Sequence, residues 1–314
     1  MILTVTLNAA LDLTYQVPGW RPGATHRAAD VAEHPGGKGV NVARVLHTLG
    51  EPVVATGLAG GSTGAAIRQL LGDLRHSFVD IGGSSRRTVV IADGQDATGF
   101  WEPGPTVEPA EWHAFVQHYR ARLRVSRVAV LSGSLPPGLP VDAYAELVRA
   151  AREAEVPVIL DTSGEPLLAG LAAVPTIVKP NAHELAIATG MPVGAFGPGA
   201  EELATTEALA AAEELRNGLP TAVVASLGAA GLVASTVDGS WHASLPEALT
   251  GNPTGAGDAA VAALARGLAY RLPWPARLSD AVGLAAAAVV APVAGDVSRA
   301  DYQRFRRMAV VVEL

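Results

Sequence analysis

Residues 127–161 read RVAVLSGSLPPGLPVDAYAELVRAAREAEVPVILD and contain the pattern that decides the fold. An apolar, β-branched run at 127–133 is followed by a glycine- and proline-rich loop, a helical stretch at 142–154 and a second apolar run at 156–161. Continuous apolar runs are typical of buried parallel strands, and a helix usually connects two such strands. This stretch therefore predicts one strand–helix–strand unit of a parallel sheet.

The same alternation continues on both sides of this unit. Further apolar runs that indicate strands lie at 2–7, 52–59, 175–180 and 221–226. Stretches with helical periodicity lie between them, at 39–50, 62–74, 110–123 and 206–218. Strands that alternate with helices are typical of a doubly wound α/β fold, so we predict a mostly parallel sheet flanked by helices.

Two stretches do not fit this alternation. Residues 13–35 are a polar mixture, and residues 85–102 have the pattern of a β-hairpin that turns near Asp93 and Gly94. We predict that both belong to a small antiparallel flap over one edge of the main sheet. The predicted division is a discontinuous β lid, 9–35 and 85–102, and a large α/β domain that binds nucleotide and substrate, 1–8, 36–84 and 103–314.

The composition excludes several classes of protein. The 314 residues include no cysteine, so disulfides, zinc–thiolate sites and cysteine nucleophiles are excluded. The net charge of -7 argues against nucleic acid or an anionic membrane as the main partner. The first residues lack the basic start of a signal peptide, and the most apolar late segment, 281–295, is too short to cross a membrane. We therefore expect a cytoplasmic protein that binds small molecules.

Residues 252–264, NPTGAGDAAVAAL, place two glycines and an aspartate at the start of an alanine-rich helical run. Gly255, Ala256 and Gly257 carry almost no side chain, so an anion can approach the N–H groups at the helix start. Asp258 follows at once, and a carboxylate beside an anion site is favourable when it accepts a proton from an attacking hydroxyl. The alternative is a glycine turn before a capped helix.

A second glycine cluster, PGGKGVN at 35–41, precedes another helical stretch. Gly36 and Gly37 allow the backbone to approach a ligand closely, Lys38 adds a positive charge, and Asn41 opens the helix. The alternative is an ordinary hairpin turn before a helix. The pattern GxxxxGK[ST] of a Walker A loop is absent from the chain.

Polar residues also follow several predicted strands, where an open α/β sheet binds its ligands. Asp12 follows the first predicted strand and can accept hydrogen bonds from two sugar hydroxyls, and Ser134 follows the strand at 127–133. Asn181 and Glu184 follow another strand, and their oxygens suit a magnesium ion bound through waters. The alternatives are an exposed loop position for Asp12 and a helix-capping box for the last pair.

These motifs occur together in one chain, which resembles the PfkB family of ribokinase-like sugar kinases along essentially its whole length. The motifs that carry the resemblance are GGKGVN (36–41), SGSLPPG (132–138), VKPNAHE (178–184), SLG (226–228) and NPTGAGDA (252–259). GGKGxN and TGAGD are the two strong signatures. With NxALD at 8–12, the set is similar to the branch that phosphorylates already phosphorylated hexoses, 1-phosphofructokinase and tagatose-6-phosphate kinase.

The resemblance implies a ribokinase-like fold with a small β-sheet lid, and it implies a role for each site residue. Asp258, with an ordinary pKa of about 3.9, would take the proton of the sugar hydroxyl, and the backbone of 255–257 would form the anion hole. Residues implied to bind the sugar are Asp12, Gly36, Gly37, Asn41 and Ser134. Residues implied to bind ATP are Lys179, Asn181, Ser226, Gly228 and Gly231, with Glu184 and Asn181 on the Mg²⁺ ion.

The second phosphate of such a substrate requires cations. The candidates are Lys38, Arg27 just before the glycine cluster, and Arg86 or Arg87 at the start of the predicted hairpin, since a guanidinium donates two hydrogen bonds to phosphate. The alternative is that these arginines are solvated charges on the lid. Lid strands would also leave exposed edges, so we expect a homodimer through the lid.

The resemblance thus implies an ATP- and Mg²⁺-dependent kinase that converts a phosphorylated ketohexose into a hexose bisphosphate. Two alternatives stay open: a kinase of the same fold for an unphosphorylated sugar or nucleoside, and a sugar- or nucleotide-binding regulator without catalysis. The choice among fructose 1-phosphate, tagatose 6-phosphate and fructose 6-phosphate also stays open. A dinucleotide-binding oxidoreductase is disfavoured, because no GxGxxG follows the first predicted strand.

Overall fold

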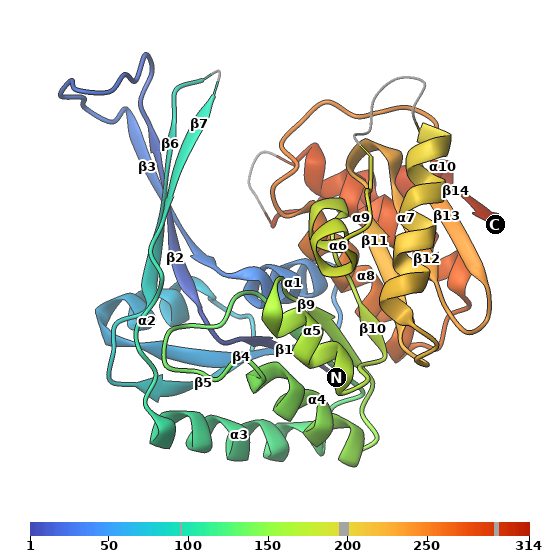
Figure 1. The fold of residues 1–314 in the computed structure, drawn as a ribbon. Helices are drawn as coiled ribbons and strands as arrows, with labels where there is room; N and C mark the ends of the chain where they lie inside the picture. The colour runs from blue at the N-terminus through green and yellow to red at the C-terminus, as the bar shows by residue number, and fades with distance from the viewer. Residues whose placement is uncertain (95, 195–200, 292–294) are drawn as a thin grey trace.

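The computed structural model describes residues 1–94, 96–194, 201–291 and 295–314, and these residues form two separate β-sheets (Figure 1). The strands of the larger sheet are β1 (Ile2–Thr6), β4 (Val53–Gly60), β5 (His76–Ile81), β8 (Val128–Ser132), β9 (Val158–Asp161), β10 (Ile177–Val178), β11 (Ala222–Ser226), β12 (Leu232–Ser235), β13 (Ser240–Ser244) and β14 (Val310–Glu313). Across the described residues the order of this 10-stranded sheet is β14-β13-β12-β11-β10-β9-β8-β1-β4-β5.

The strand pairs from β11 to β5 are all parallel, which confirms the parallel sheet predicted from the apolar runs. β5 and the antiparallel strands β12 to β14 were not predicted. β13 alternates buried with half-buried residues, and β14 is largely exposed. β13 therefore lacks the continuous apolar run that marks a buried parallel strand, whereas the short apolar runs of β12 and β14 were overlooked.

Helices cover both faces of the large sheet (Figure 1). Their bounds are α1 (Lys38–Thr48), α2 (Gly61–Leu70), α3 (Pro109–Leu123), α4 (Ala143–Glu153), α5 (Glu165–Ala172), α6 (Ala182–Thr189), α7 (Glu201–Arg216), α8 (Ala256–Ala269), α9 (Trp274–Val289) and α10 (Arg299–Met308). One core contains residues of α1, α8, α9 and α10, and the other contains residues of α3, α4, α5 and α7. Successive residues of β8 alternate between the two cores, so this strand is buried on both sides.

The small sheet consists of β2 (Ala10–Gln16), β3 (Asp30–Gly36), β6 (Arg86–Ala92) and β7 (Ala97–Trp101), in the order β3-β2-β6-β7. It extends away from the large sheet (Figure 1). β6 and β7 form the predicted hairpin, closed by a hydrogen bond of 3.1 Å from Asp93 N to Asp96 O. The prediction of a purely antiparallel flap is wrong, because β2 and β6 run parallel.

The strand predicted at 2–7 is confirmed as β1 of the large sheet, and the next strand, β2, belongs to the small sheet. β1 ends at Thr6, and the chain enters β2 of the small sheet at Ala10. Asp12 therefore lies within a strand of the small sheet and not in a loop after the first strand. Along the described parts of the chain, no helix has the length and apolarity needed to cross a membrane.

Candidate active site

Asp258 lies in the first turn of α8, at the end of the large sheet where the parallel strands finish. Gly255 precedes the helix with φ of 88°, a conformation that favours glycine. The Asp258 carboxyl is 7% exposed, and its Oδ2 accepts a hydrogen bond of 2.8 Å from Asn41 Nδ2 on α1. The helix start and the first turn of α1 thus place an amide and a carboxyl in direct contact.

Burial raises the pKa of Asp258 to about 7, and the nearby charge of Asp161 adds to the rise. The hydrogen bond from Asn41 and the charges of Lys38 and Lys179 lower this pKa in part. The ordinary pKa expected for Asp258 is therefore wrong, because the sequence does not show that the carboxyl is buried. A carboxyl with this pKa exchanges protons near neutral pH, as a general base should.

Asp161, at the end of β9, is a functional candidate that the sequence analysis missed. Its carboxyl is 1% exposed and lies 3.3 Å from Lys179 Nζ and 3.5 Å from Lys38 Nζ, measured from Oδ1. Ser132 Oγ donates to its Oδ2 over 3.1 Å. Burial alone would raise the pKa of Asp161, but the charges of Lys179 and Lys38 hold it below its usual value. Its place as the last residue of a predicted strand is a signal that could have found it.

Close packing explains why the second cluster consists of glycines. A Cβ on Gly36 would overlap the carboxylate of Asp12. A Cβ on Gly37 would lie 2.7 Å from Thr6 Cγ2, and one on Gly39 would lie 2.5 Å from Thr6 Oγ1. The small size of these residues therefore lets the first turn of α1 pack closely against β1, which places Lys38 beside Asp161. Contact of Gly36 and Gly37 with a ligand stays a prediction.

Asp12 faces a group of cationic side chains at the base of the small sheet. It pairs with His34 on β3 and with Thr88 on β6, and residues opposite each other share one face of a sheet. Arg86 lies two residues before Thr88 and so projects from that same face. Burial raises the pKa of Asp12, while a hydrogen bond from Thr88 and the charges of Arg86, Arg44 and His34 oppose the rise.

Arg86 and Ser134 are both joined to Asn8, which follows β1. Arg86 donates from Nε to Asn8 O over 3.2 Å and from Nη1 to Glu102 O over 3.3 Å. Asn8 Nδ2 in turn donates to Ser134 Oγ over 3.2 Å and to Pro103 O over 3.0 Å. Asn8 therefore joins the base of the small sheet to the loop after β8, a role that the sequence analysis did not assign.

Arg27 is not brought to this group of residues. It lies exposed in the connection between β2 and β3, at the end of the small sheet that points away from the large sheet (Figure 1). The expectation that Arg27 joins Lys38 and Arg86 on one phosphate is therefore wrong for a single copy of the chain. Arg27 precedes the glycine cluster in the sequence, but the whole of β3 separates them in the structure. The sequence position of Arg27 was therefore misleading.

Lys179, which the resemblance assigns to ATP, is buried and lies close to the start of α8. A Cβ on Gly257 would be 3.6 Å from Lys179 Nζ, so the ammonium group reaches the first turn of the helix that carries Asp258. Lys38, Lys179, Asp161 and Asp258 therefore form one charged cluster. Two carboxyls and two ammonium groups in this cluster come from four separate elements.

Asn181 and Glu184 form the helix-capping box that was the alternative to a metal site. Asn181 N donates to Glu184 Oε2 and Glu184 N donates to Asn181 Oδ1, both over 2.8 Å. Burial lowers the pKa of Lys38, but the charges of Asp161 and, to a smaller degree, Glu184 raise it above its usual value. Glu184 fits a Mg²⁺ ion that keeps most of its waters, whereas the oxygen of Asn181 already serves the helix. In the described parts of the chain no three His, Cys, Asp or Glu residues gather as a metal site.

The remaining nucleotide candidates lie beside this helix start. Ser226 pairs with Asn181 in a parallel bridge, and Ser226 N donates to Pro180 O over 3.0 Å. Gly228 has φ of 60°, and a Cβ there would meet nothing within 4 Å, so its surface is open. Gly231 is different, because a Cβ would overlap Ala243 O of β13. Close packing therefore explains Gly231, and its contact with a nucleotide stays a prediction.

Known proteins share this fold across nearly the whole chain. Phosphofructokinase-2 from Escherichia coli, in a crystal structure with potassium, is 28% identical with a TM-score of 0.88, and the match covers 98% of both chains. A structure of the tetrameric inhibited form of the same enzyme has a TM-score of 0.87. A possible 1-phosphofructokinase from Thermotoga maritima is 27% identical with a TM-score of 0.86, over 100% of this chain and 99% of that one.

The more distant ribokinase of Arabidopsis thaliana, complexed with ribose and ATP, is 21% identical with a TM-score of 0.72 over 98% of both chains, and shows the shared fold alone. The family model described as pfkB family carbohydrate kinase matches residues 4–299. The protein is therefore a phosphotransferase that uses an alcohol group as acceptor, and it belongs to the pfkB family of carbohydrate kinases.

Proposed function

We propose that the protein transfers the γ-phosphate of ATP, with Mg²⁺, to a hydroxyl of a phosphorylated ketohexose and so produces a hexose bisphosphate. The observation that carries the proposal is the position of Asp258 at the start of α8, with its carboxyl bonded to Asn41 and a pKa of about 7. The phosphofructokinase relatives support the substrate class. We also propose that the reaction takes place in the cytoplasm, where ATP and sugar phosphates are available.

In this proposal Asp258 accepts the proton of the attacking hydroxyl. The N–H groups at the start of α8 have no carbonyl partner within the helix, and together with Lys38 and Lys179 they stabilise negative charge on the phosphoryl group. Ala256 N already donates to Pro253 O over 3.1 Å, so it contributes less than its neighbours to this stabilisation. Mg²⁺, when bound, would neutralise charge on the triphosphate, and Glu184 is the residue proposed to hold it through waters.

The substrate class is tested with ATP, Mg²⁺ and a panel of acceptors. The panel contains fructose 1-phosphate, tagatose 6-phosphate and fructose 6-phosphate, and also fructose, ribose and adenosine. We expect ADP release with at least one sugar phosphate and a kcat/KM at least about a hundredfold lower for the neutral acceptors, because the cations that bind the second phosphate would then lack an anionic partner. Preference for a neutral acceptor would favour the unphosphorylated-sugar kinase, and no turnover with any acceptor would favour the regulator.

Arg86 is expected to bind the phosphate of the acceptor. Two backbone carbonyls hold its guanidinium, which leaves other N–H groups directed to the face of Asp12. Arg86→Lys removes the paired donors, so we expect the KM for the sugar phosphate to rise about 10- to 100-fold with little change in the KM for ATP. Arg87→Lys is the control, since Arg87 pairs with the exposed Glu102 carboxylate at 3.0 Å. Equal KM values in Arg86→Lys and wild type would remove Arg86 from the phosphate site.

A homodimer through the small sheet is also proposed. Its edge strands are β3 and β7, and three large apolar residues of these strands are exposed: Val31 at 44%, Phe100 at 55% and Trp101 at 68%. Pairing with a second copy would cover unpaired strand edges and these side chains. Light scattering at micromolar concentration should give twice the chain mass, and Trp101→Asp should shift it to the monomer. A wild-type monomer would contradict the proposal, and a tetramer would show a further interface.

A further inference from the structure

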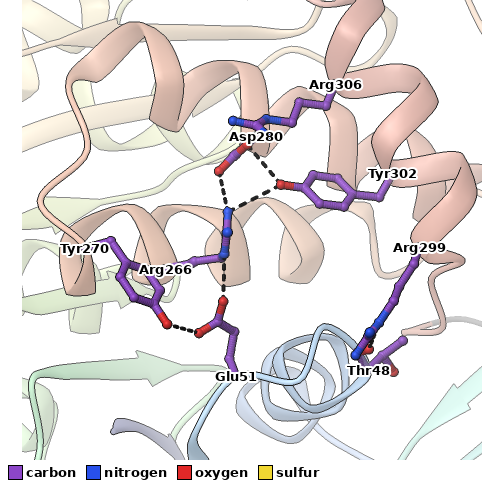
Figure 2. A network of polar contacts seen from close by, with 8 residues as sticks. All are labelled: Thr48, Glu51, Arg266, Tyr270, Asp280, Arg299, Tyr302 and Arg306. Carbon is purple, nitrogen blue, oxygen red and sulfur yellow. Dashed lines mark hydrogen bonds and ion pairs between the residues drawn. The ribbon is translucent and has the colours of Figure 1, made fainter.

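Asp280 on α9 is a buried carboxylate that the proposed reaction does not use. Its exposed fraction is 0%. Its Oδ2 accepts from Arg266 Nη1 on α8 over 2.8 Å, and its Oδ1 accepts from Tyr302 on α10 over 2.9 Å (Figure 2). Arg306 Nε, also on α10, lies 2.5 Å from the same Oδ1. One carboxylate therefore joins three helices.

Arg266 connects this carboxylate to the end of α1. Arg266 Nε donates to Glu51 Oε1 over 2.7 Å, and Tyr270 donates to Glu51 Oε2 over 2.7 Å (Figure 2). Arg299 Nε donates over 2.6 Å to the carbonyl of Thr48, the last residue of α1. We call the set Glu51, Arg266, Asp280, Tyr302 and Arg306 the Asp280 network.

The same two helices carry the candidate catalytic residues at their other ends. Asn41 lies in the first turn of α1, and Asp258 lies in the first turn of α8. Asp258 and Arg266 are about 12 Å apart along α8, at 1.5 Å per residue. α8 is therefore fixed at two places, by Asp258 with Asn41 of α1 and by Arg266 with Glu51 in the turn after α1. Glu51 N donates to Leu46 O of α1 over 3.0 Å, so this turn is itself held on the helix.

The buried residues of α8 are mostly small, although Val261 and Leu264 are also fully buried. The small residues of its buried face are Ala259, Ala260, Ala262, Ala263 and Ala265. Alanine methyl groups form shallow ridges, so a small slide or rotation of the helix loses little contact. A buried ionic cluster adds little net stability over apolar packing, but its directional contacts are satisfied in only one arrangement. The Asp280 network therefore determines position more than stability.

We infer that Arg266 is a positioning residue for the proposed reaction. By donating hydrogen bonds to both Glu51 and Asp280, it fixes α8 against α1 and keeps the Asp258 carboxyl in contact with Asn41. Arg266 touches neither substrate. This inference rests on the proposed function of Asp258 as the base. It adds that the position of Asp258 depends on Arg266, which lies two helical turns further along α8.

The test is Arg266→Met in the full chain. Methionine fills much of the volume without the charge, while Asp280 keeps Tyr302 and Arg306. We expect kcat to fall about 10- to 100-fold with the KM for ATP unchanged, because small displacements of a catalytic group are costly. The acid limb of the pH profile of kcat should move to higher pH, since the hydrogen bond from Asn41 lowers the pKa of Asp258. Arg266→Lys should restore most of the lost kcat.

A double-mutant cycle with Asn41→Ala separates this role from a general structural one. If Arg266 acts through the contact between Asn41 and Asp258, the double variant has the kcat of Asn41→Ala alone. Arg68→Met is the matched control: Arg68 pairs with Asp80 at 2.6 Å, and its side chain is 24% exposed against 28% for Arg266. We expect Arg68→Met to leave kcat unchanged in either background.

Two results would overturn the role of Arg266: a wild-type kcat and pH profile in Arg266→Met, or a double variant whose loss equals the product of the single losses. A wild-type protein that transfers no phosphate would instead refute the proposed function. The role is then still tested by ¹³C NMR titration of the Asp258 carboxyl, assigned with Asp258→Asn. A higher pKa in Arg266→Met supports the positioning role, and an unchanged pKa contradicts it.

Discussion

Asp258→Asn is expected to lower kcat by about 10²- to 10⁴-fold and to leave the affinity for ATP unchanged. The amide has nearly the shape of the carboxylate and can still contact Asn41, but it cannot accept the proton of the sugar hydroxyl. The loss therefore falls on the chemical step and not on binding. Steady-state kinetics with the best acceptor of the panel, together with calorimetric titration of ATP, measure the two quantities separately.

A matched control is Asp301→Asn. Asp301 also lies in the first turn of a helix, α10, but outside the charged cluster, so kcat should not change. Turnover of Asp258→Asn within about twofold of wild type would remove Asp258 as the base, because general-base catalysis contributes at least about a hundredfold.

The same substitution has a predicted effect on stability. The folded pKa of Asp258 is about 7, above the usual value of about 3.9 for this side chain, so the folded state binds this proton more tightly than the unfolded state. The wild type therefore loses stability as the pH rises from about 4 to about 7, with no further loss from this group at higher pH. Relative to wild type, Asp258→Asn should gain unfolding free energy across that range in urea titrations. A constant difference would mean that the carboxyl is not desolvated.

Asp161→Asn lowers the unfolding free energy by about 3–5 kcal/mol, the usual cost of breaking a buried ion pair from one side. Its carboxylate is 1% exposed, and its Oδ1 lies near the ammonium groups of Lys38 and Lys179. Removal of the charge leaves the buried Lys179 with no anionic partner at 3.3 Å. Urea unfolding at pH 7.5 measures the loss, provided that both proteins unfold in one step.

Asp161→Asn should also change the reaction. The negative charge of Asp161 helps to raise the pKa of Asp258, so its removal lowers that pKa and shifts the acid limb of the rate profile to lower pH. Asp80→Asn is the control for stability, since its pair with Arg68 is exposed on the carboxylate side and should contribute about 1 kcal/mol or less. A loss below about 1 kcal/mol in Asp161→Asn would show that the cluster is more hydrated than its burial indicates.

The parallel core could be predicted because its signal is local. β8 and β9 are continuous apolar runs separated by a helical stretch, and that pattern alone specifies the unit. The place of Asp12 could not be predicted in this way. Asn8 and Asp12 interrupt the apolar residues of 2–13, so the sequence allows a loop after the first strand, and a strand has the same periodicity in either sheet. Only the structure shows that Asp12 lies within β2, paired with His34 and Thr88.

The candidate site was predicted where a motif is contiguous and missed where it is assembled from distant elements. Asp258 and the glycine before α8 belong to one short motif. Asp161 acquires its significance only when Lys38 and Lys179 reach it from other elements, and the pKa of Asp258 depends on that burial. Glycines are ambiguous in a sequence, because a Gly36 that makes room for Asp12 and a glycine that makes room for a ligand look alike.

The pH dependence of kcat/KM in the wild-type protein, measured with saturating ATP and the preferred acceptor, tests the central claim most directly. If Asp258 is the base, activity rises with pH through an acid limb near pH 7, where the buried carboxyl loses its proton. The residual activity of Asp258→Asn should lack this limb. A limb near pH 4, or one that persists unchanged in Asp258→Asn, would contradict the assignment of Asp258 as a buried general base.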